Sequence, residues 1–138
     1  MKVRFTVPGE PQGKARPRFN SKTGITYTPN ETVEYERLVV LAYRSKVGNV
    51  KFPDNASIDM RIRAYFKIPA SDNKKKRAQK ESGEVRPTKK PDWDNIGKII
   101  ADSLNGVAYH DDTQIVDAQV RKFYSDVPRV EVTIEDVT

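Results

Sequence analysis

The stretch SIDMRIRAYFKI, residues 57–68, has the clearest structural pattern in the chain. Its apolar and polar side chains alternate up to the last isoleucine, and Pro69 follows directly. Such alternation is typical of a strand with one face in the core and one face outward, and proline cannot continue the hydrogen bonding of a strand. We therefore expect a half-buried strand that presents charged side chains, Arg61 and Arg63 among them, on its outer face.

Patterns on either side of this strand complete the fold prediction. Three further stretches alternate in the same way and predict one opening and two closing strands, at 2–7, 115–125 and 129–135. Helical spacing of apolar residues predicts two main helices, over 29–47 and 95–104, and a shorter helix is compatible with 72–82. The order β-α-β-α-β-β predicts an α/β (α+β) fold with a small mixed sheet in one domain, residues 1–138.

The segment before the first helix is irregular. Residues 8–27 contain repeated prolines and glycines, which predict a long basic loop. TPNE at 28–31 has the spacing of a capping box, with Thr28 as the N-cap and Pro29 at the first helical position. We expect the helix that follows to turn four apolar side chains toward the core: Leu38, Val39, Leu41 and Ala42.

Composition excludes several kinds of chemistry. The chain has 138 residues, 36% of them hydrophobic and 32% charged, which is compatible with one globular core. It has no cysteine, and this excludes disulfides, thiol catalysis and zinc-thiolate sites. His110 is the one histidine, which makes a histidine-rich metal site or a serine-protease-like triad improbable. Any metal would be held by oxygen ligands, which suit Mg²⁺, Mn²⁺ or Ca²⁺.

The sequence predicts no membrane partner. The opening MKVRFTV is too short and too charged for the apolar region of a signal peptide. No apolar run approaches the ~20 residues that a membrane helix needs. We expect a soluble, cytoplasmic protein.

The positive charge points to a polyanionic partner. The net charge is +6 and the pI is near 9.5. Basic residues concentrate in KARPR (14–18), KKKRAQK (74–80) and RPTKKP (86–91). The predicted DNA-binding residues are Lys14, Arg16, Arg18, Lys74, Lys75, Lys76, Arg77, Lys89 and Lys90. The alternative is a solvated loop for the first stretch and a mobile solvated run for the second.

Four aspartates bracket the second main helix. Asp92 and Asp94 precede it and, being two residues apart, point the same way if that segment is extended. The residues after the helix are long enough to bring Asp111 and Asp112 back to its start, or to reach a partner subunit. Clustered carboxylates repel one another, so such a cluster indicates a bound cation or raised pKa values.

A metal held by oxygen ligands beside basic residues suits phosphodiester hydrolysis. The metal polarises the phosphoryl oxygen and activates water. Lys98, four residues after Asp94, is placed to neutralise charge on the phosphate. Plainer interpretations stay open at this point: Asp92 or Asp94 as an N-cap, Asp111–Asp112 as a turn pair, and Lys98 as a solvated partner of Asp94.

Two neighbouring aromatic residues have structural interpretations. Trp93 lies between two of the aspartates, and we expect it to pack beneath the site rather than to stack on a base. His110 precedes the second pair, and we expect it to be structural or on the surface.

The stretch KPDWDNIGKIIADSLNGVAYHDDTQIVDAQVRK resembles the signature of the RusA family of Holliday junction resolvases. The shared skeleton is D-x-D-N, a lysine, D-x-L-N-G, D-D and Q-[IV]-V. In this chain it comprises Asp92, Asp94, Asn95, Lys98, Asp102, Leu104, Asn105, Gly106, Asp111, Asp112, Gln114 and Val116. The opening VPGEPQGKARPRF is similar to that of many phage and prophage members, and the predicted element order is similar to the family's fold.

The resemblance implies a homodimeric endonuclease that uses Mg²⁺, for which Mn²⁺ can substitute. Its substrate would be four-way junction DNA rather than a small molecule, cut by paired nicks in recombination and repair. Asp92, Asp94 and Asp112 match the metal-binding catalytic aspartates, and Lys98 matches the catalytic lysine. Asp111 is a further metal-ligand candidate, because the segment before the pair is about one residue shorter than in the best-known members.

Two other functions compete with junction resolution. A nuclease of the same fold could cut forks or flaps. A non-catalytic basic DNA-binding module would use the carboxylates only as caps and turns. The enzymes and the module differ in whether a metal is required.

Overall fold

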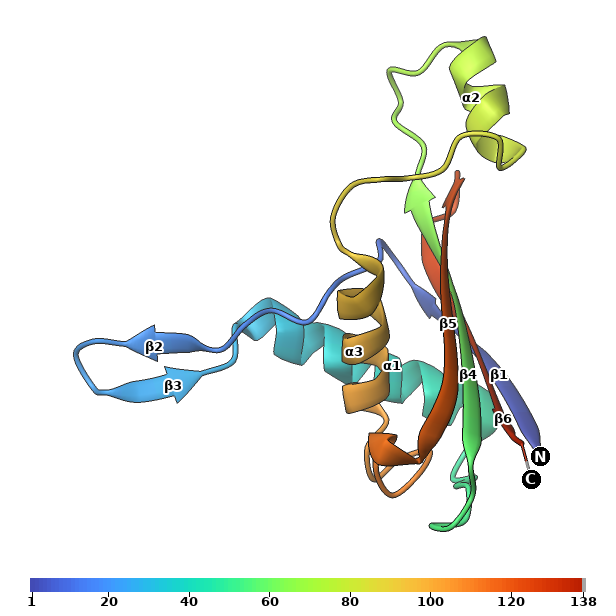
Figure 1. Cartoon of the computed structure of the whole chain (residues 1–138). Helices are drawn as coiled ribbons and strands as arrows, with labels where there is room; N and C mark the ends of the chain where they lie inside the picture. Colours follow the sequence, from blue (N-terminus) through green and yellow to red (C-terminus); the bar gives the residue numbers. More distant parts are fainter. Residues whose placement is uncertain (138) are drawn as a thin grey trace.

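A four-stranded mixed sheet organises the computed structural model, which describes residues 1–137 (Figure 1). Its strands are β1 (Lys2–Pro8), β4 (Ile58–Lys67), β5 (Ile115–Ser125) and β6 (Arg129–Asp136), in the order β1-β6-β4-β5. β6 pairs antiparallel with β1 and β4, whereas β4 and β5 are parallel. The predicted α/β (α+β) fold with a mixed sheet is therefore confirmed, as are all four predicted strands.

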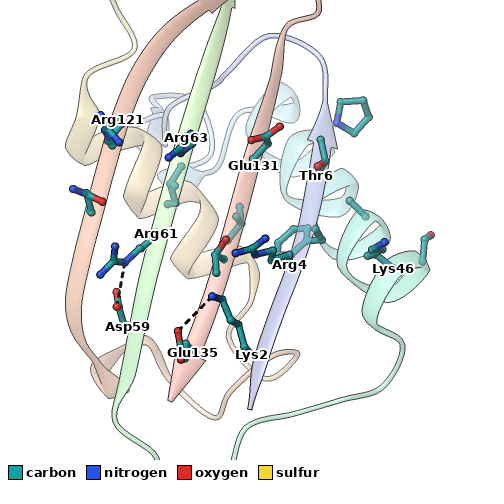
Figure 2. Close-up of a pocket in the computed structure, with 18 of the residues that line it drawn as sticks. Lys2, Arg4, Thr6, Lys46, Asp59, Arg61, Arg63, Arg121, Glu131 and Glu135 are labelled. Carbon is teal, nitrogen blue, oxygen red and sulfur yellow. Dashed lines mark hydrogen bonds and ion pairs between the residues drawn. The ribbon is translucent and has the colours of Figure 1, made fainter. Parts of the chain in front are cut away.

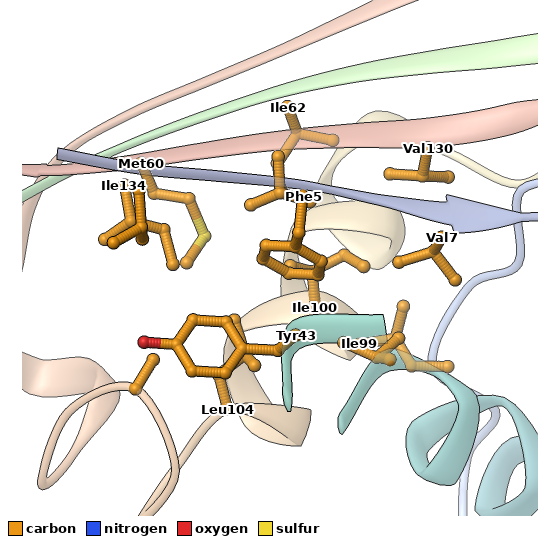
Figure 3. Packing of buried hydrophobic residues seen from close by; sticks show 14 of the residues in the cluster. Phe5, Val7, Tyr43, Met60, Ile62, Ile99, Ile100, Leu104, Val130 and Ile134 are labelled. Carbon is orange, nitrogen blue, oxygen red and sulfur yellow. The ribbon is translucent and has the colours of Figure 1, made fainter. Parts of the chain in front are cut away.

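Two helices, α1 (Asn30–Val47) and α3 (Trp93–Ser103), cover one face of the sheet. The buried residues of the strands alternate, as Val3, Phe5 and Val7 do in β1. Phe5 meets Tyr43 of α1 edge to face, with 5.3 Å between ring centroids (Figure 3). Each fully buried side chain of this kind contributes roughly 1.5–3 kcal/mol, so this layer holds α1 and α3 on the sheet.

The other face of the sheet is polar. Along β4 the buried residues are the even-numbered ones from Ile58 to Phe66, and Arg61 and Arg63 are exposed between them. In the part of the chain that the structure describes, no helix lies over this outer face (Figure 2). The alternation in residues 57–68 therefore reflects a sheet with one face packed on the core and the other face charged.

Helix α1 begins differently from the prediction. The backbone N–H groups of Thr32 and Val33 donate to the Pro29 carbonyl at 3.1 and 3.2 Å, which makes Pro29 the N-cap. The helix therefore starts one residue later than the capping box requires, and no side chain caps it. Leu41 was expected in the core but is 62% exposed, whereas Val39 is buried as predicted and Leu38 and Ala42 pack partly buried against the core. Thr32, Tyr35 and Tyr43 complete the inward face.

The predicted loop 8–27 contains a hairpin that the sequence analysis missed. β2 (Arg18–Asn20) and β3 (Ile25–Tyr27) pair antiparallel, and the hairpin projects away from the sheet. The Asn20 side chain accepts hydrogen bonds from the backbone N–H groups of Lys22 and Thr23, and Gly24 adopts a φ of +70° that favours glycine. All six strand residues are exposed, so no pattern of alternating burial was available to predict these two strands.

The basic stretch 74–80 is helical. The short helix α2 (Lys74–Glu81) confirms the element expected over 72–82. Asn73 caps it by accepting from the Lys76 N–H at 2.9 Å, and Arg77 pairs with Asp126 after strand β5. The cap and the ion pair give the segment a defined helical structure, while Lys74, Lys75 and Lys76 are exposed to solvent. None of the helices among residues 1–137 is long and apolar enough to cross a membrane.

Candidate active site along helix α3

Helix α3 separates an apolar face from a charged one. Its buried residues are Ile96, Ile99, Ile100 and Ser103. Asp94, Lys98 and Asp102 follow one another at intervals of four residues and so occupy one stripe of the helix. The packing of the isoleucines against the sheet fixes the rotation of α3, and this rotation turns the charged stripe outward.

The first pair of aspartates lies at the start of α3. Asp92 is the N-cap residue with an extended backbone, and its carbonyl accepts the first helical bond from the Ile96 N–H at 3.0 Å. Its carboxylate makes no capping hydrogen bond. Asp92 therefore occupies the N-cap position, as the plainer interpretation expected, but its side chain does not cap the helix. Asp94 is exposed in the first turn, where a negative charge is favoured by the helix dipole.

The second pair of carboxylates combines Asp112 with Asp102 of the last helical turn. Asp112 opens the short 3₁₀ turn η1 (Asp112–Gln114), and its carboxyl group lies close to that of Asp102. Burial raises the pKa of Asp112, the Asp102 carboxylate raises it further, and Lys98 opposes the shift. Two carboxylates in contact share a proton or require a cation between them.

Sequence reasoning left Asp102 out of the candidate site. It was recognised only as part of the family skeleton, although its spacing from Asp94 and Lys98 placed it on their stripe. That spacing was the available signal. The contact with Asp112 depends on the path of the chain after the helix, which no local pattern revealed.

Two lysines neutralise this second pair. Lys98 Nζ lies 3.6 Å from an Asp102 carboxylate oxygen, so its helical partner is Asp102 and not Asp94. Lys14 Nζ lies 3.5 Å from the same oxygen and donates to Glu36 of α1 at 3.1 Å. Burial alone would lower the pKa of Lys14, but Glu36 and Asp102 raise it overall. The solvated-loop interpretation is thus wrong for Lys14, which links α1 and α3.

Asp111 has a different environment from Asp112. Its carboxylate accepts from the Thr113 hydroxyl at 2.7 Å and from the Thr113 N–H at 3.3 Å, and these bonds lower the pKa of Asp111. In return, the Gln114 side-chain oxygen accepts from the Asp111 N–H at 3.2 Å. The turn interpretation is confirmed for Asp111. Asp112 is the member of the pair that faces Asp102.

Buried contacts hold the returning loop in place. Tyr109 lies in the core, and its hydroxyl donates to the Ala101 carbonyl at 2.7 Å. Burial, with smaller contributions from Asp112, Asp102 and Asp111, raises the pKa of Tyr109 and keeps its hydroxyl protonated. The Gln114 amide donates to the Pro53 carbonyl at 2.9 Å, which ties η1 to the segment before β4. Together these contacts position Asp112 against the last turn of α3.

The two carboxylate pairs occupy opposite ends of the helix. Asp94 and Asp102 are eight residues apart, which corresponds to roughly 12 Å along the axis. The returning loop therefore brings Asp112 to the last turn rather than to the start of α3. Across residues 1–137, no group of three or more histidine, cysteine, aspartate or glutamate side chains is arranged to hold a metal ion.

The donor chemistry still fits a hard cation. Mg²⁺ is commonly bound by one or two protein carboxylates, with water and substrate phosphate oxygens completing its shell. The neighbouring carboxylates of Asp102 and Asp112 match such a partial site.

The basic residues are distributed around the start of α3 and beyond it. Arg16, Lys90 and Asp92 line one shallow groove between the N-terminal segment and α3. The two walls touch at Gly13, where an added Cβ would lie 3.0 Å from Asn95 Cβ. Outside this groove, Lys74, Lys75 and Lys76 are exposed on α2, Arg18 is exposed on the hairpin, and Lys89 is exposed in the connection before α3.

The aromatic residues near the site differ from one another. Trp93 is 65% exposed at the first position of α3, so the expectation that it packs beneath the site is wrong. The isoleucines that follow occupy the inward face of the helix and leave Trp93 outside it. His110 is exposed, as expected for a surface residue.

Comparison with known proteins relates nearly the whole chain to one family. The family model described as "Endodeoxyribonuclease RusA" matches residues 8–135. The chain is also 37% identical, over 138 residues, to a protein of Bacillus subtilis (strain 168) described as "Uncharacterized protein YqaN". That alignment covers 99% of this chain and 97% of the relative.

Proposed function

This chain belongs to the RusA family of endodeoxyribonucleases, and we propose that it resolves four-way (Holliday) DNA junctions by paired symmetrical nicks in recombination and repair. The observation that carries the proposal is the charged stripe of α3. There, family motif residues bring two carboxylates and a lysine together on an outward surface. The net charge of +6 provides attraction for DNA around this acidic centre.

The family's nucleases are generally dependent on a divalent metal. At the last turn of α3 we assign its binding to Asp112, with Asp102 as an additional residue and Asp111 as a flanking candidate. Asp92 and Asp94 lie roughly 12 Å away along the helix axis and would hold a separate ion at the first turn. When bound, Mg²⁺ or Mn²⁺ supplies charge that polarises a phosphoryl oxygen and acidifies water. Asp102 raises the pKa of the neighbouring Asp112, and this repulsion between carboxylates supports placing the cation beside them.

Lys98 is the residue assigned to the scissile phosphate. Its side chain is 61% exposed while its ammonium stays 3.6 Å from Asp102. It can therefore donate to a phosphate oxygen and neutralise charge that develops there. Lys14, with 23% of its side chain exposed and two carboxylate neighbours, is a positioning residue that holds Asp102 and Glu36 in place.

DNA contacts are assigned to the basic residues around this centre. Arg16 and Lys90 flank Asp92 in the groove beside α3 and suit backbone phosphates. Lys89 and Arg18 extend this surface along the connection and the hairpin, and Lys74, Lys75, Lys76 and Arg77 extend it over α2. We propose a homodimer, because a two-fold junction requires two cuts that a two-fold protein supplies. It would act as one RusA-like domain in the cytoplasm of a bacterial or phage-infected cell.

The test is cleavage of a synthetic mobile four-way junction in Mg²⁺ or EDTA, with linear duplex of the same sequence as competitor. Metal-dependent symmetrical nicks on the junction alone are expected. Asp94→Asn should lose cleavage and keep binding, because it removes a negative charge near phosphate without removing a basic contact. Equal cleavage by Asp94→Asn and wild type would contradict the catalytic assignment.

A non-catalytic DNA-binding module is the competing proposal. It is favoured by one observation, the absence of a three-carboxylate group across residues 1–137. Tight junction binding without cleavage in either Mg²⁺ or Mn²⁺ would support it. Cleavage of forks or flaps in preference to four-way junctions would instead retain the nuclease and change its substrate.

A further inference from the structure

The outer face of the sheet has an ordered arrangement of charge. The strand register places Thr6, Glu131, Arg63 and Arg121 in one row across β1, β6, β4 and β5 (Figure 2). The next row toward the carboxyl end of β5 contains Arg129, Tyr65 and Phe123. Asp59 and Asp117 oppose each other at the far end of the same two strands. At that far end Glu135 and the two aspartates offset basic residues such as Lys2, so the net positive charge of the face lies at the end with Arg63 and Arg121.

Two stacked rings form the centre of the positive end. Tyr65 and Phe123 lie with 5.6 Å between centroids and an interplanar angle of 25°. Four guanidinium groups surround the rings: Arg63, Arg86, Arg121 and Arg129. The distances from guanidinium carbon to the Phe123 centroid are 4.2, 5.1 and 5.9 Å for Arg86, Arg121 and Arg63 respectively. Arg129 lies 3.9 Å from the Tyr65 centroid. The rings hold the arginines by cation–π attraction and restrict their motion.

Three of these arginines, Arg63, Arg86 and Arg121, form what we name the arginine cluster. Among the described residues, none of the three has a carboxylate within ion-pair distance, whereas Arg129 pairs with Glu131 at 2.9 Å and Arg61 with Asp59 at 3.2 Å. Arg63 and Arg121 are direct cross-strand neighbours. Like charges that face each other across strands destabilise a sheet, and an anion placed between them would remove this repulsion.

The connection from α2 to α3 joins the arginine cluster to the proposed active site. Arg86 lies in this connection, and its Nε donates to the Lys122 carbonyl of β5 at 2.8 Å. Three residues later, the Lys89 carbonyl accepts from Lys122 Nζ at 2.6 Å. The connection thus lies against the outer edge of strand β5 and leads from there to the start of α3 (Figure 1).

We propose that the arginine cluster is a second DNA-binding site, which takes the phosphodiester backbone of a duplex arm away from the scissile phosphate. Guanidinium groups form paired hydrogen bonds with phosphate oxygens, and arginines already fixed on aromatic rings lose less motional freedom on binding. The arm passes around β5 from the outer face toward Asp92. The choice of DNA as the polyanion rests on the proposed function.

The test is binding of a fluorescent four-way junction in EDTA, measured by anisotropy over a series of KCl concentrations. Arg63→Gln/Arg121→Gln should weaken binding roughly tenfold and reduce the slope of log K against log salt by about 1.8, or 0.9 for each lost phosphate contact. The control Arg37→Gln/Arg44→Gln removes the same charge from exposed positions of α1, on the other side of the sheet, and should leave the slope unchanged.

Arg86→Gln is a second test variant, for the case that the double substitution within the strands impairs folding. Arg86 lies outside the strands, and its loss should reduce the slope of log K against log salt by about 0.9. Affinities and slopes equal to those of the control variant would overturn the proposal. A changed oligomeric state in sedimentation, with DNA affinity intact, would also overturn it and identify the face as a subunit contact. Because EDTA prevents metal-dependent cleavage, these results are independent of whether wild-type protein nicks junctions in Mg²⁺, which tests the proposed function separately.

Discussion

The two ends of helix α3 carry the same kind of side chain in opposite settings. At the first turn, Asp92 and Asp94 are exposed, and Asp92 does not use its carboxylate as a cap. At the last turn, Asp102 lies in a half-buried network with Lys14, Lys98 and Asp112. Exposed carboxylates are free to meet a ligand, whereas enclosed ones have a geometry fixed before any ligand arrives.

The difference indicates that the two ends of α3 have different roles. A fixed pair of carboxylates with a neighbouring lysine suits bond-breaking chemistry, because preorganised charge needs no rearrangement in the transition state. Exposed carboxylates beside Arg16 and Lys90 suit an adjustable part of the site that forms when DNA binds. Substitutions that affect one end only would establish this division.

Asp112→Asn should have the largest effect. Nicking of a four-way junction in Mg²⁺ should fall roughly 100-fold or more, because a charged metal ligand is lost. The same change should raise the free energy of unfolding in EDTA by about 1 kcal/mol at neutral pH, since it removes repulsion between two carboxylates. Because the pKa of Asp112 is raised in the folded state, this gain should disappear as the pH falls below that pKa.

Asp111→Ala is the matched comparison for this change. It removes the acceptor for the Thr113 N–H and should lower the midpoint of urea unfolding, with measurable nicking retained. A variant at position 111 that lost as much activity as Asp112→Asn would show that both aspartates are required.

Lys98→Met should come next in size. Because Lys98 is 61% exposed, its ion pair with Asp102 contributes little to stability, and the midpoint of urea unfolding should stay nearly unchanged. Nicking should fall about 100-fold, because no other residue is assigned to neutralise the phosphate. Unaltered single-turnover nicking would remove Lys98 from the site.

Lys14→Met should show the reverse pattern. Its side chain is 23% exposed and bridges Glu36 and Asp102, so its loss leaves two half-buried carboxylates without their shared cation. The free energy of unfolding should fall by roughly 1–2 kcal/mol, between the values for exposed and buried pairs. Nicking should fall less than in Lys98→Met. If Lys14→Met changed only the affinity for DNA, Lys14 would be a phosphate contact and not a link between helices.

Lys98 and Lys14 also show which parts of the site can be predicted from the sequence. Alternation and helical spacing predict the strands and α3, because burial on one side of an element imposes a period on its own residues. Lys98 was found in this way through its spacing from Asp94. The link from Lys14 to Asp102 joins segments 88 positions apart in the printed chain, and no local period encodes it.

Other features were missed for related reasons. The hairpin of β2 and β3 has three residues in each strand and buries none of them, so its sequence shows only the prolines and glycines of a loop. The capping box at 28–31 had the correct residue types, but the chain enters α1 with Pro29 extended and leaves Thr28 outside the helix. The residue types at 28–31 are compatible with more than one first residue of the helix, and packing of the helix determines which one is adopted.

The smallest predicted effect compares two buried tyrosines. Tyr109 donates its hydroxyl to the Ala101 carbonyl at 2.7 Å, beneath the Asp102–Asp112 pair. The Tyr35 hydroxyl in α1 is buried and, among residues 1–137, finds no hydrogen-bond partner. Removing a satisfied hydroxyl loses a hydrogen bond, whereas removing an unsatisfied one relieves a desolvation penalty. Tyr109→Phe should therefore lower the free energy of unfolding by about 1 kcal/mol, and Tyr35→Phe should raise it by a similar amount. Urea unfolding followed by circular dichroism measures both, and a loss of stability in Tyr35→Phe would mean that its hydroxyl has a partner in solution.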